Sequence, residues 1–254
     1  MQLPPIGEGN GVLDKPHVFL DEIMRQAQES EIIRLTMQIR DNKPLKPFKG
    51  KEVQILSKRE VVSGLYLWAD QIIAAKNETR RGINALMRKY LYGSDDPMPV
   101  EGDKVICLRN DWNVLSAADD VLVNGLIGNI YNVTPQRGIP FINEVIQASF
   151  LPDSYTLQDL DMAPVDLMFR NLRLDKKLIT TGVPTVNQDN FQKIPRKIKP
   201  KEFDYGYCIT CHKSQGSEYS KVLVFEEYLR GGDHAKWLYT AATRSRDRLV
   251  IVKA

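Results

Sequence analysis

The spacing of apolar residues predicts a long helix near the start of the chain and a strand after it. Residues 19–41, "FLDEIMRQAQESEIIRLTMQIRD", repeat apolar side chains at intervals typical of one helix face, and Asp21 is a candidate N-cap. The residues of this face are Ile23, Ala27, Ile32, Leu35 and Ile39. Two prolines in "NKPLKPF" (42–48) end the pattern, and "EVQILS" (52–57) then alternates β-branched and polar positions, as a strand does.

Two further helices are predicted before residue 100, and a different pattern follows them. The helices are "EVVSGLYLWADQIIAA" (60–75) and "ETRRGINALMRKYL" (78–91). This alternation of strand and helix favours an α/β layer with a parallel sheet. After residue 100, short β-like runs are separated by Gly, Asn, Asp and Pro, which is typical of a small barrel or a β-rich insertion. The runs are "GDKVICLRND" (102–111), "LVNGLIGNIYNVT" (122–134) and "FINEVIQASFL" (141–151).

The α/β pattern returns at residue 205, after a stretch from about 150 to 204 in which the pattern is weak. The predicted elements are a strand in "YGYCITC" (205–211), a turn and short helix in "HKSQGSEYS" (212–220), a strand in "KVLVFEE" (221–227), a helix in "HAKWLYTAATRSR" (234–246) and a strand in "RLVIVKA" (248–254). The simplest architecture is therefore one α/β domain interrupted by a β-rich insertion.

The composition is that of a soluble globular protein with room for one large or two small domains. The 254 residues are 43% hydrophobic and 26% charged, and the net charge of +3 says little about partners. The three cysteines are an odd number, which argues against a disulfide framework and indicates a reducing compartment. No apolar run approaches the roughly 20 residues of a membrane span. The opening "MQLPPIGEGNG" lacks an apolar leader and reads as the middle of a loop, so we expect an upstream portion.

The segment "TCHKSQGSEYSKVLVF" (210–225) is a candidate phosphate site. A strand is predicted to end at Thr210, and a polar turn follows in which Gly216 allows a ligand to approach the backbone. Hydroxyl groups, a lysine and a helix N-terminus near Glu218 would suit an anion at the carboxyl edge of a parallel sheet. The alternative is a simple polar turn.

Three arginines follow the last predicted helix, which would bury Trp237, Leu238 and Ala241. Arg244 would stand at the helix C-terminus, where a cation is favoured, and an arginine can direct two donors at one phosphate. The alternative is that the three arginines are solvated and pair with Asp247 or Glu227. The arginines are Arg244, Arg246 and Arg248.

Two other features are given simpler interpretations. "CITC" (208–211) has the spacing of a metal site, but the chain has no second cysteine pair and only His212 lies nearby, so we predict no metal. The basic stretch "QKIPRKIKPKEF" (192–203) could contact a nucleic-acid backbone or form a solvated crossover.

Taken in order, these segments resemble the C-terminal half of a superfamily 1 DNA helicase. The matching blocks are "QLPP", "LDEIMRQAQESEII", "NDW" with "VNGLIGNI", "TCHKSQGSEY" and "YTAATRSRDRLVIV". The pair "HKSQGSE" and "YTAATRS" at this separation is the most specific of them. The closest resemblance is to the 5′-to-3′ branch that includes RecD-like and phage Dda-like enzymes.

The resemblance implies roles for individual residues. Gln2 matches the motif III glutamine that senses the γ-phosphate, and Arg25 matches the motif IV arginine that contacts it. Tyr239, Thr243 and Arg244 belong to motif VI, in which Arg244 holds the arginine-finger position. The residues implied to contact the single-strand backbone are Thr210, His212 and Lys213. The residues implied to bind the nucleotide are Gln215, Gly216, Glu218 and Tyr239.

The implied fold is a RecA-like second motor domain, of the P-loop NTPase type but without the phosphate loop. Its expected parts are residues 1–98 and 205–254, and residues 99–204 would form an inserted barrel resembling a Src-homology-3 domain. No G-x-x-x-x-G-K-[ST] motif occurs in the sequence. ATP and Mg²⁺ would therefore be bound mainly by an N-terminal RecA-like motor domain outside this chain, and the chain alone would be inactive.

The resemblance thus implies the C-terminal motor portion of an ATP-dependent helicase that translocates 5′-to-3′ on single-stranded DNA. Expected partners are single-stranded DNA, the N-terminal motor domain and replication or recombination proteins, without a membrane. The expected location is the cytoplasm of a bacterial or phage-infected host cell. The alternative function is a non-catalytic module that binds single-stranded nucleic acid or regulates a partner motor.

Overall fold

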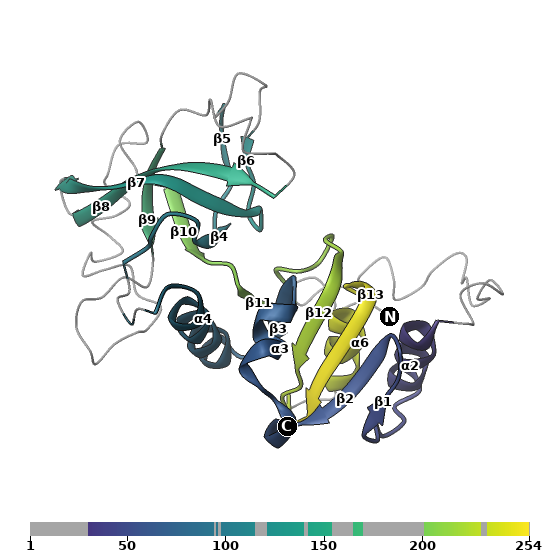
Figure 1. The fold of residues 1–254 in the computed structure, drawn as a ribbon. Helices are drawn as coiled ribbons and strands as arrows, with labels where there is room; N and C mark the ends of the chain where they lie inside the picture. Colours follow the sequence, from purple (N-terminus) through teal and green to yellow (C-terminus); the bar gives the residue numbers. More distant parts are fainter. Residues whose placement is uncertain are drawn as a thin grey trace, which may run out of the picture. The chain divides into compact units, whose positions relative to one another are not determined.

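The computed structural model divides the chain into two compact units, which are described separately below. The structure describes residues 30–93, 95, 98–114, 121–139, 142–153, 165–169, 201–229 and 233–253. The first unit contains the residues up to Arg80 and those from Cys208 onward, and the second contains Arg81–Tyr207. Figure 1 shows the helices and strands of both.

The first unit is built on a six-stranded sheet. The strand order is β1 (Phe48–Lys49), β2 (Val53–Ser57), β13 (Ser245–Lys253), β12 (Tyr219–Phe225), β3 (Gln71–Ala74) and β11 (Cys208–Thr210). β1 pairs antiparallel with β2, and every other pairing in this sheet is parallel. The inner strands carry almost unbroken runs of buried Val, Ile and Leu, because a parallel sheet is covered on both faces. The predicted α/β fold with a parallel sheet is confirmed.

Helices cover both faces of the sheet. α2 (Glu31–Arg40) and α6 (His234–Ala242) pack against each other beside β13. α3 (Ser63–Trp68) lies on the opposite face, next to β12 (Figure 1). In α2 the predicted apolar face is buried at Ile32, Leu35 and Ile39. Its other members, Ile23 and Ala27, and the candidate cap Asp21 lie outside the described residues.

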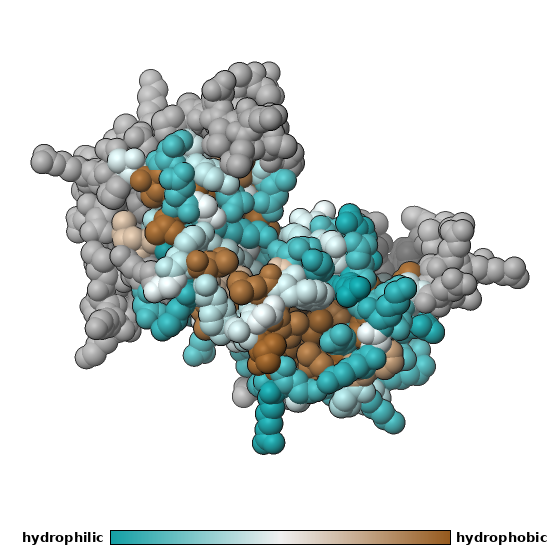
Figure 2. Space-filling view, viewed as in Figure 1, coloured by the Kyte–Doolittle hydropathy of each residue, from teal (hydrophilic) through white to brown (hydrophobic). Residues whose placement is uncertain are grey.

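α3 covers only part of its face of the sheet. Figure 2 shows apolar residues gathered on that face of the first unit. Val62 and Leu67 are the exposed large hydrophobic residues of this segment. An open groove of about 290 Å³ is lined in part by Val62, Trp68, Lys51 and Arg248.

Two predicted elements were wrong. The helix predicted over residues 60–75 ends at Trp68, and Gln71–Ala74 instead form the fully buried strand β3. A short apolar run fits a buried strand and a buried helix equally well, so its periodicity gave the wrong choice. The short helix predicted within residues 212–220 is also absent, because the backbone turns through that segment and β12 begins at Tyr219.

The start of α2 and the start of β2 are joined by two carboxylates. The Glu52 carboxylate accepts hydrogen bonds from the Ser30 hydroxyl and the Glu31 backbone N–H, both at 2.9 Å. The Glu31 carboxylate in turn accepts from the backbone N–H groups of Glu52 at 2.8 Å and Val53 at 3.0 Å. A Cβ atom placed on Gly50 would lie 2.3 Å from Glu31 Oε2, so this carboxylate lock requires glycine there.

The carboxylate lock predicts acid sensitivity. Backbone hydrogen bonds from Glu52 and Val53 hold the pKa of Glu31 below its ordinary value. The folded state therefore favours the ionised form, which stabilises the fold above the ordinary Glu pKa of about 4.3 and stops doing so as the pH falls through the lowered value. We expect Glu31→Gln to lower the urea midpoint at pH 7 and to differ less from the wild type below pH 4. A pH-independent difference, or an equal loss in the control Glu101→Gln, would contradict this.

The second unit contains a closed ring of hydrogen-bonded strands. The ring is formed by β10 (Lys201–Tyr205), β4 (Lys104–Cys107), β7 (Ile127–Ile139), β8 (Ile142–Pro152) and β9 (Val165–Phe169), and a separate pair by β5 (Asp111–Val114) and β6 (Val121–Leu122). The rings of Phe150 and Phe203 meet edge to face inside it, with centroids 5.0 Å apart. The resemblance of this ring to a Src-homology-3 barrel stays a prediction.

α4 (Asn77–Tyr92) contains the division between the units, at Arg80–Arg81. The sequence predicted that the inserted domain begins at residue 99, after this division. The predicted domain bounds 1–98, 99–204 and 205–254 stay a prediction. In the part of the chain that the structure describes, no helix is both long and apolar enough to cross a membrane.

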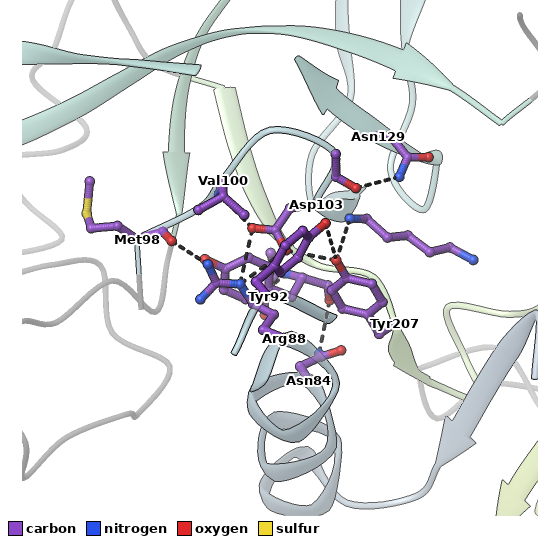
Figure 3. Close-up of polar contacts among 12 residues, drawn as sticks. Asn84, Arg88, Tyr92, Met98, Val100, Asp103, Asn129 and Tyr207 are labelled. Carbon is purple, nitrogen blue, oxygen red and sulfur yellow. Dashed lines mark hydrogen bonds and ion pairs between the residues drawn. The ribbon is translucent and has the colours of Figure 1, made fainter. Parts of the chain in front are cut away.

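A buried ion pair attaches α4 to the strand ring (Figure 3). Nε of Arg88 lies 3.1 Å from both carboxylate oxygens of Asp103, and the two side chains are 5% and 0% exposed. The guanidinium also donates to the Met98 carbonyl and lies 4.5 Å from the centre of the Tyr205 ring. The charge of Arg88 is therefore matched by an anion, a carbonyl and an aromatic face.

The remaining lone pairs of Asp103 are also used. Oδ1 accepts from the Tyr207 hydroxyl and Oδ2 from the Val100 N–H, both at 2.8 Å (Figure 3). The Tyr207 oxygen accepts from the Lys104 N–H at 3.1 Å and lies 3.4 Å from the Tyr92 hydroxyl. Burial, and next the charge of Asp103, raise the pKa of Tyr207, so that the hydroxyl remains a donor.

Candidate functional site

The predicted site residues between Thr210 and Glu218 lie in one compact turn after β11. The N–H groups of Lys213 and Ser214 donate to the Thr210 carbonyl, at 2.9 and 3.2 Å. Ser214 is fully buried, and its hydroxyl donates to the Cys211 carbonyl at 2.7 Å. These bonds close the turn internally. The side chains of His212, Gln215 and Glu218 are exposed around it.

Gly216 reverses the chain at the end of this turn. Its φ is +88°, a conformation that glycine adopts readily and other residues do not. No heavy atom lies within 4 Å of a Cβ built on it, so the backbone angle alone requires glycine. The turn was predicted from this glycine, but its closure by a buried serine was not.

The second group of predicted residues lies in α6 and directly after it. Trp237, Leu238 and Ala241 are buried, as predicted. Tyr239 is half-buried, and its carbonyl accepts the N–H of Thr243, the residue that ends the helix. Arg244 follows directly, between α6 and β13.

The turn and the end of α6 meet at the same place. The Tyr219 N–H donates to the Arg244 carbonyl at 2.9 Å, and Nη1 of Arg244 donates to the Ser217 carbonyl at 3.2 Å. Near the start of the turn, the Cys211 thiol lies 3.6 Å from the Trp237 carbonyl. Two segments about thirty positions apart in the sequence therefore lie in direct contact.

Arg244 carries a positive charge that no described carboxylate balances. Its guanidinium is half-buried and donates to two carbonyls, of Thr240 at 3.1 Å and of Ser217, and to the Thr243 hydroxyl at 3.2 Å. All three acceptors are neutral. A guanidinium held in this way remains able to attract an anion.

The neighbouring arginines differ from Arg244. Arg246 is exposed and forms an ion pair with Asp247 at 3.3 Å, and Arg248 is exposed. Glu227, the other acid considered as a partner, accepts from the Ala75 and Lys76 N–H groups and from the Thr79 hydroxyl. Among the described residues, Arg246 is thus the one of the three arginines that pairs with either of these acids, and its partner is Asp247.

The two cysteines of "CITC" are buried thiols. Burial raises the pKa of Cys211 to about 12, although the Ser214 hydrogen bond and the Arg244 charge act in the opposite direction. Burial also raises the pKa of Cys208. Across the described residues, no three His, Cys, Asp or Glu side chains form a group suited to a metal ion.

Two predicted site residues, Gln2 and Arg25, lie outside the described residues. The structure also adds acceptors that sequence reasoning missed, the carbonyls of Thr240 and Ser217. Backbone carbonyls leave no signal in residue types, so no motif could have revealed them.

The last part of the chain is similar to a known family. The family model of the UvrD-like helicase C-terminal domain matches residues 205–252, which include the turn, α6 and Arg244. The uncharacterized protein MJ1519 of Methanocaldococcus jannaschii is 36% identical over 69 residues, covering 27% of this chain and 6% of that protein.

A solved helicase resembles this chain in fold. The Pif1 helicase of Candida albicans is 15% identical, with a TM-score of 0.50, and the match covers 99% of this chain and 61% of that one. A Bacteroides Pif1 helicase, solved with ADP-AlF3 and single-stranded DNA, is 17% identical with a TM-score of 0.48 and coverages of 93% and 51%. This chain therefore spans between about half and three fifths of their length. The predicted resemblance to the C-terminal half of a superfamily 1 helicase is confirmed.

Proposed function

We propose that this chain is the C-terminal motor portion of an ATP-dependent helicase that translocates 5′-to-3′ on single-stranded DNA. The observation that carries the proposal is the meeting of the 210–218 turn with Arg244, whose guanidinium has only neutral partners among the described residues. Both segments lie within the stretch that matches a helicase C-terminal domain.

ATP would bind between this chain and an N-terminal motor domain that carries the phosphate loop. Arg244 would approach the γ-phosphate and stabilise the charge of the transferring phosphoryl group. The exposed Gln215 and Glu218, with Gly216 and Tyr239, would face the nucleotide. Mg²⁺ would be bound by the other domain, since the described part of this chain offers no cluster of metal ligands.

Single-stranded DNA would be contacted at the start of the same turn. Thr210 and Lys213 are half-exposed and His212 is exposed, so their side chains can reach a phosphate backbone. Hydrogen bonds link Thr210 through Ser214 to Ser217, so a shift of the turn on DNA binding would be transmitted to this acceptor of Arg244. We place the complete motor in the cytoplasm, acting in replication or recombination. Gln2 and Arg25 keep their proposed roles at the γ-phosphate.

The alternative is a nucleic-acid-binding or regulatory module without motor activity. The observation that favours it is the accessibility of Thr210, His212 and Lys213, because these side chains could contact a nucleic-acid backbone without ATP hydrolysis. The two functions can be distinguished by adding an N-terminal motor domain, which should produce ATP hydrolysis and unwinding with a motor portion but not with a regulatory module.

We expect the isolated chain to hydrolyse ATP negligibly. Adding an N-terminal motor domain in trans should produce DNA-stimulated hydrolysis and duplex unwinding, measured by phosphate release and strand separation. DNA binding without either activity would favour the regulatory module. DNA-stimulated hydrolysis by the isolated chain would contradict the proposal, because the chain carries no phosphate loop.

A further inference from the structure

The orientation of the Arg244 side chain depends on one neighbouring side chain. Arginine has five N–H donors, and the described contacts of Arg244 use its Nε and one donor on each terminal nitrogen. One N–H on Nη1 and one on Nη2 are left for an anion. Two of the three acceptors are backbone carbonyls, and the third is the hydroxyl of Thr243.

The Thr243 hydroxyl is itself fixed in position. Its Oγ1 donates to the Thr240 carbonyl at 3.0 Å and accepts from Nη2 of Arg244 at 3.2 Å. The same carbonyl accepts from Nε of Arg244 at 3.1 Å. Thr240, Thr243 and Arg244 therefore form a closed ring of three hydrogen bonds at the end of α6.

We propose that Thr243 is a positioning residue that sets the plane of the Arg244 guanidinium. The inference rests on the proposed role of Arg244 at a phosphate. A guanidinium binds phosphate through two parallel N–H groups, so the plane decides whether both donors reach the anion. Without the Thr243 acceptor, Nη2 loses its described partner. The guanidinium plane can then turn about the Cδ–Nε bond, and the two terminal nitrogens can exchange places by rotation about the Nε–Cζ bond.

The second support of the plane is the backbone of the 210–218 turn. Ser217 offers its carbonyl to Nη1 immediately after Gly216, whose positive φ directs the chain there. Thr243 lies on the helix and Ser217 on the turn, so the two hold the terminal nitrogens from different segments. Thr243 is the support that a side-chain substitution can remove without altering the turn.

The first test uses the isolated chain. Nitrogen-15 NMR measures how fast Nη1 and Nη2 of an arginine exchange places by rotation about the Nε–Cζ bond. The signal of Arg244 is identified as the one that disappears in Arg244→Lys. We expect slow exchange in the wild type and in Thr243→Ser, and at least several-fold faster exchange in Thr243→Val, which keeps the volume but loses the acceptor. The Arg246 signal is the control and should not change. Equal exchange of Arg244 in the serine and valine variants would overturn the inference.

The second test uses the chain supplied with an N-terminal motor domain. Thr243→Val should lower kcat for ATP about ten-fold, as expected for one hydrogen bond to a charged group, and should leave KM nearly unchanged. Thr243→Ser keeps the hydroxyl and loses only the methyl group, so its kcat should stay close to that of the wild type. A merely structural role for the methyl group would instead lower kcat in this variant. Wild-type kcat in Thr243→Val, when Arg244→Lys is inactive, would overturn the inference. Normal turnover in Arg244→Lys would instead refute the proposed function, while the NMR result would still stand.

Discussion

Replacing Arg244 with lysine is expected to lower ATP turnover by about 10³-fold in the chain supplied with an N-terminal motor domain. Lysine keeps the positive charge but has no fork of donors, so it cannot span two phosphate oxygens. It also cannot reproduce the three hydrogen bonds to Thr240, Thr243 and Ser217 together. Phosphate release at saturating ATP and single-stranded DNA measures the effect.

Arg246→Lys is the matched control for this substitution. Arg246 lies two residues away, is exposed and pairs with Asp247 on the surface. We expect turnover within about two-fold of the wild type, because exposed ion pairs contribute little. Normal turnover in Arg244→Lys, or equal losses in the two variants, would show that Arg244 has no special part in hydrolysis.

Replacing Asp103 with alanine is expected to lower the free energy of unfolding by about 3–5 kcal/mol. The substitution leaves Arg88 charged and buried without its anion, and removes the acceptor of the Tyr207 hydroxyl and the Val100 N–H. Urea denaturation followed by tryptophan fluorescence and by circular dichroism measures the loss. Two separate transitions would indicate that the two units unfold independently.

Lys89→Met serves as the control on the same helix. It removes the ion pair of Lys89 with Asp95, whose side chains are 56% and 78% exposed. An exposed pair contributes less than about 1 kcal/mol, so the midpoint should hardly move. A loss in Asp103→Ala no larger than that in Lys89→Met would mean that the buried network does not stabilise the fold.

Most elements of the first unit could be predicted because their sequences carry strong local signals. The helix α6 and the strands β2, β12 and β13 lie close to where the pattern placed them, as does α4, which spans the division between the units. β3 could not be predicted, because "QIIA" is too short for its periodicity to distinguish a strand from the end of a helix. Its identity depends on pairing with β12 and β11, which are distant in the sequence.

The candidate site was predictable to a different extent. Motif resemblance located Thr210, Gly216 and Arg244, and the structure shows that the turn and the helix end meet. The resemblance could not show what holds Arg244, because two of its three acceptors are backbone carbonyls. The expected helix near Glu218 was wrong, because the short polar segment closes on itself through Ser214 before β12 begins.

The carboxylate lock between α2 and β2 also constrains how this protein can change over evolutionary time. Glu31 and Gly50 are far apart in sequence, yet any side chain at position 50 would occupy the space of the Glu31 carboxylate. A lineage that loses Gly50 must therefore also shorten or redirect residue 31, and then find other acceptors for the amides that begin β2. Covariation of these two positions among descendants would be the historical trace of that contact.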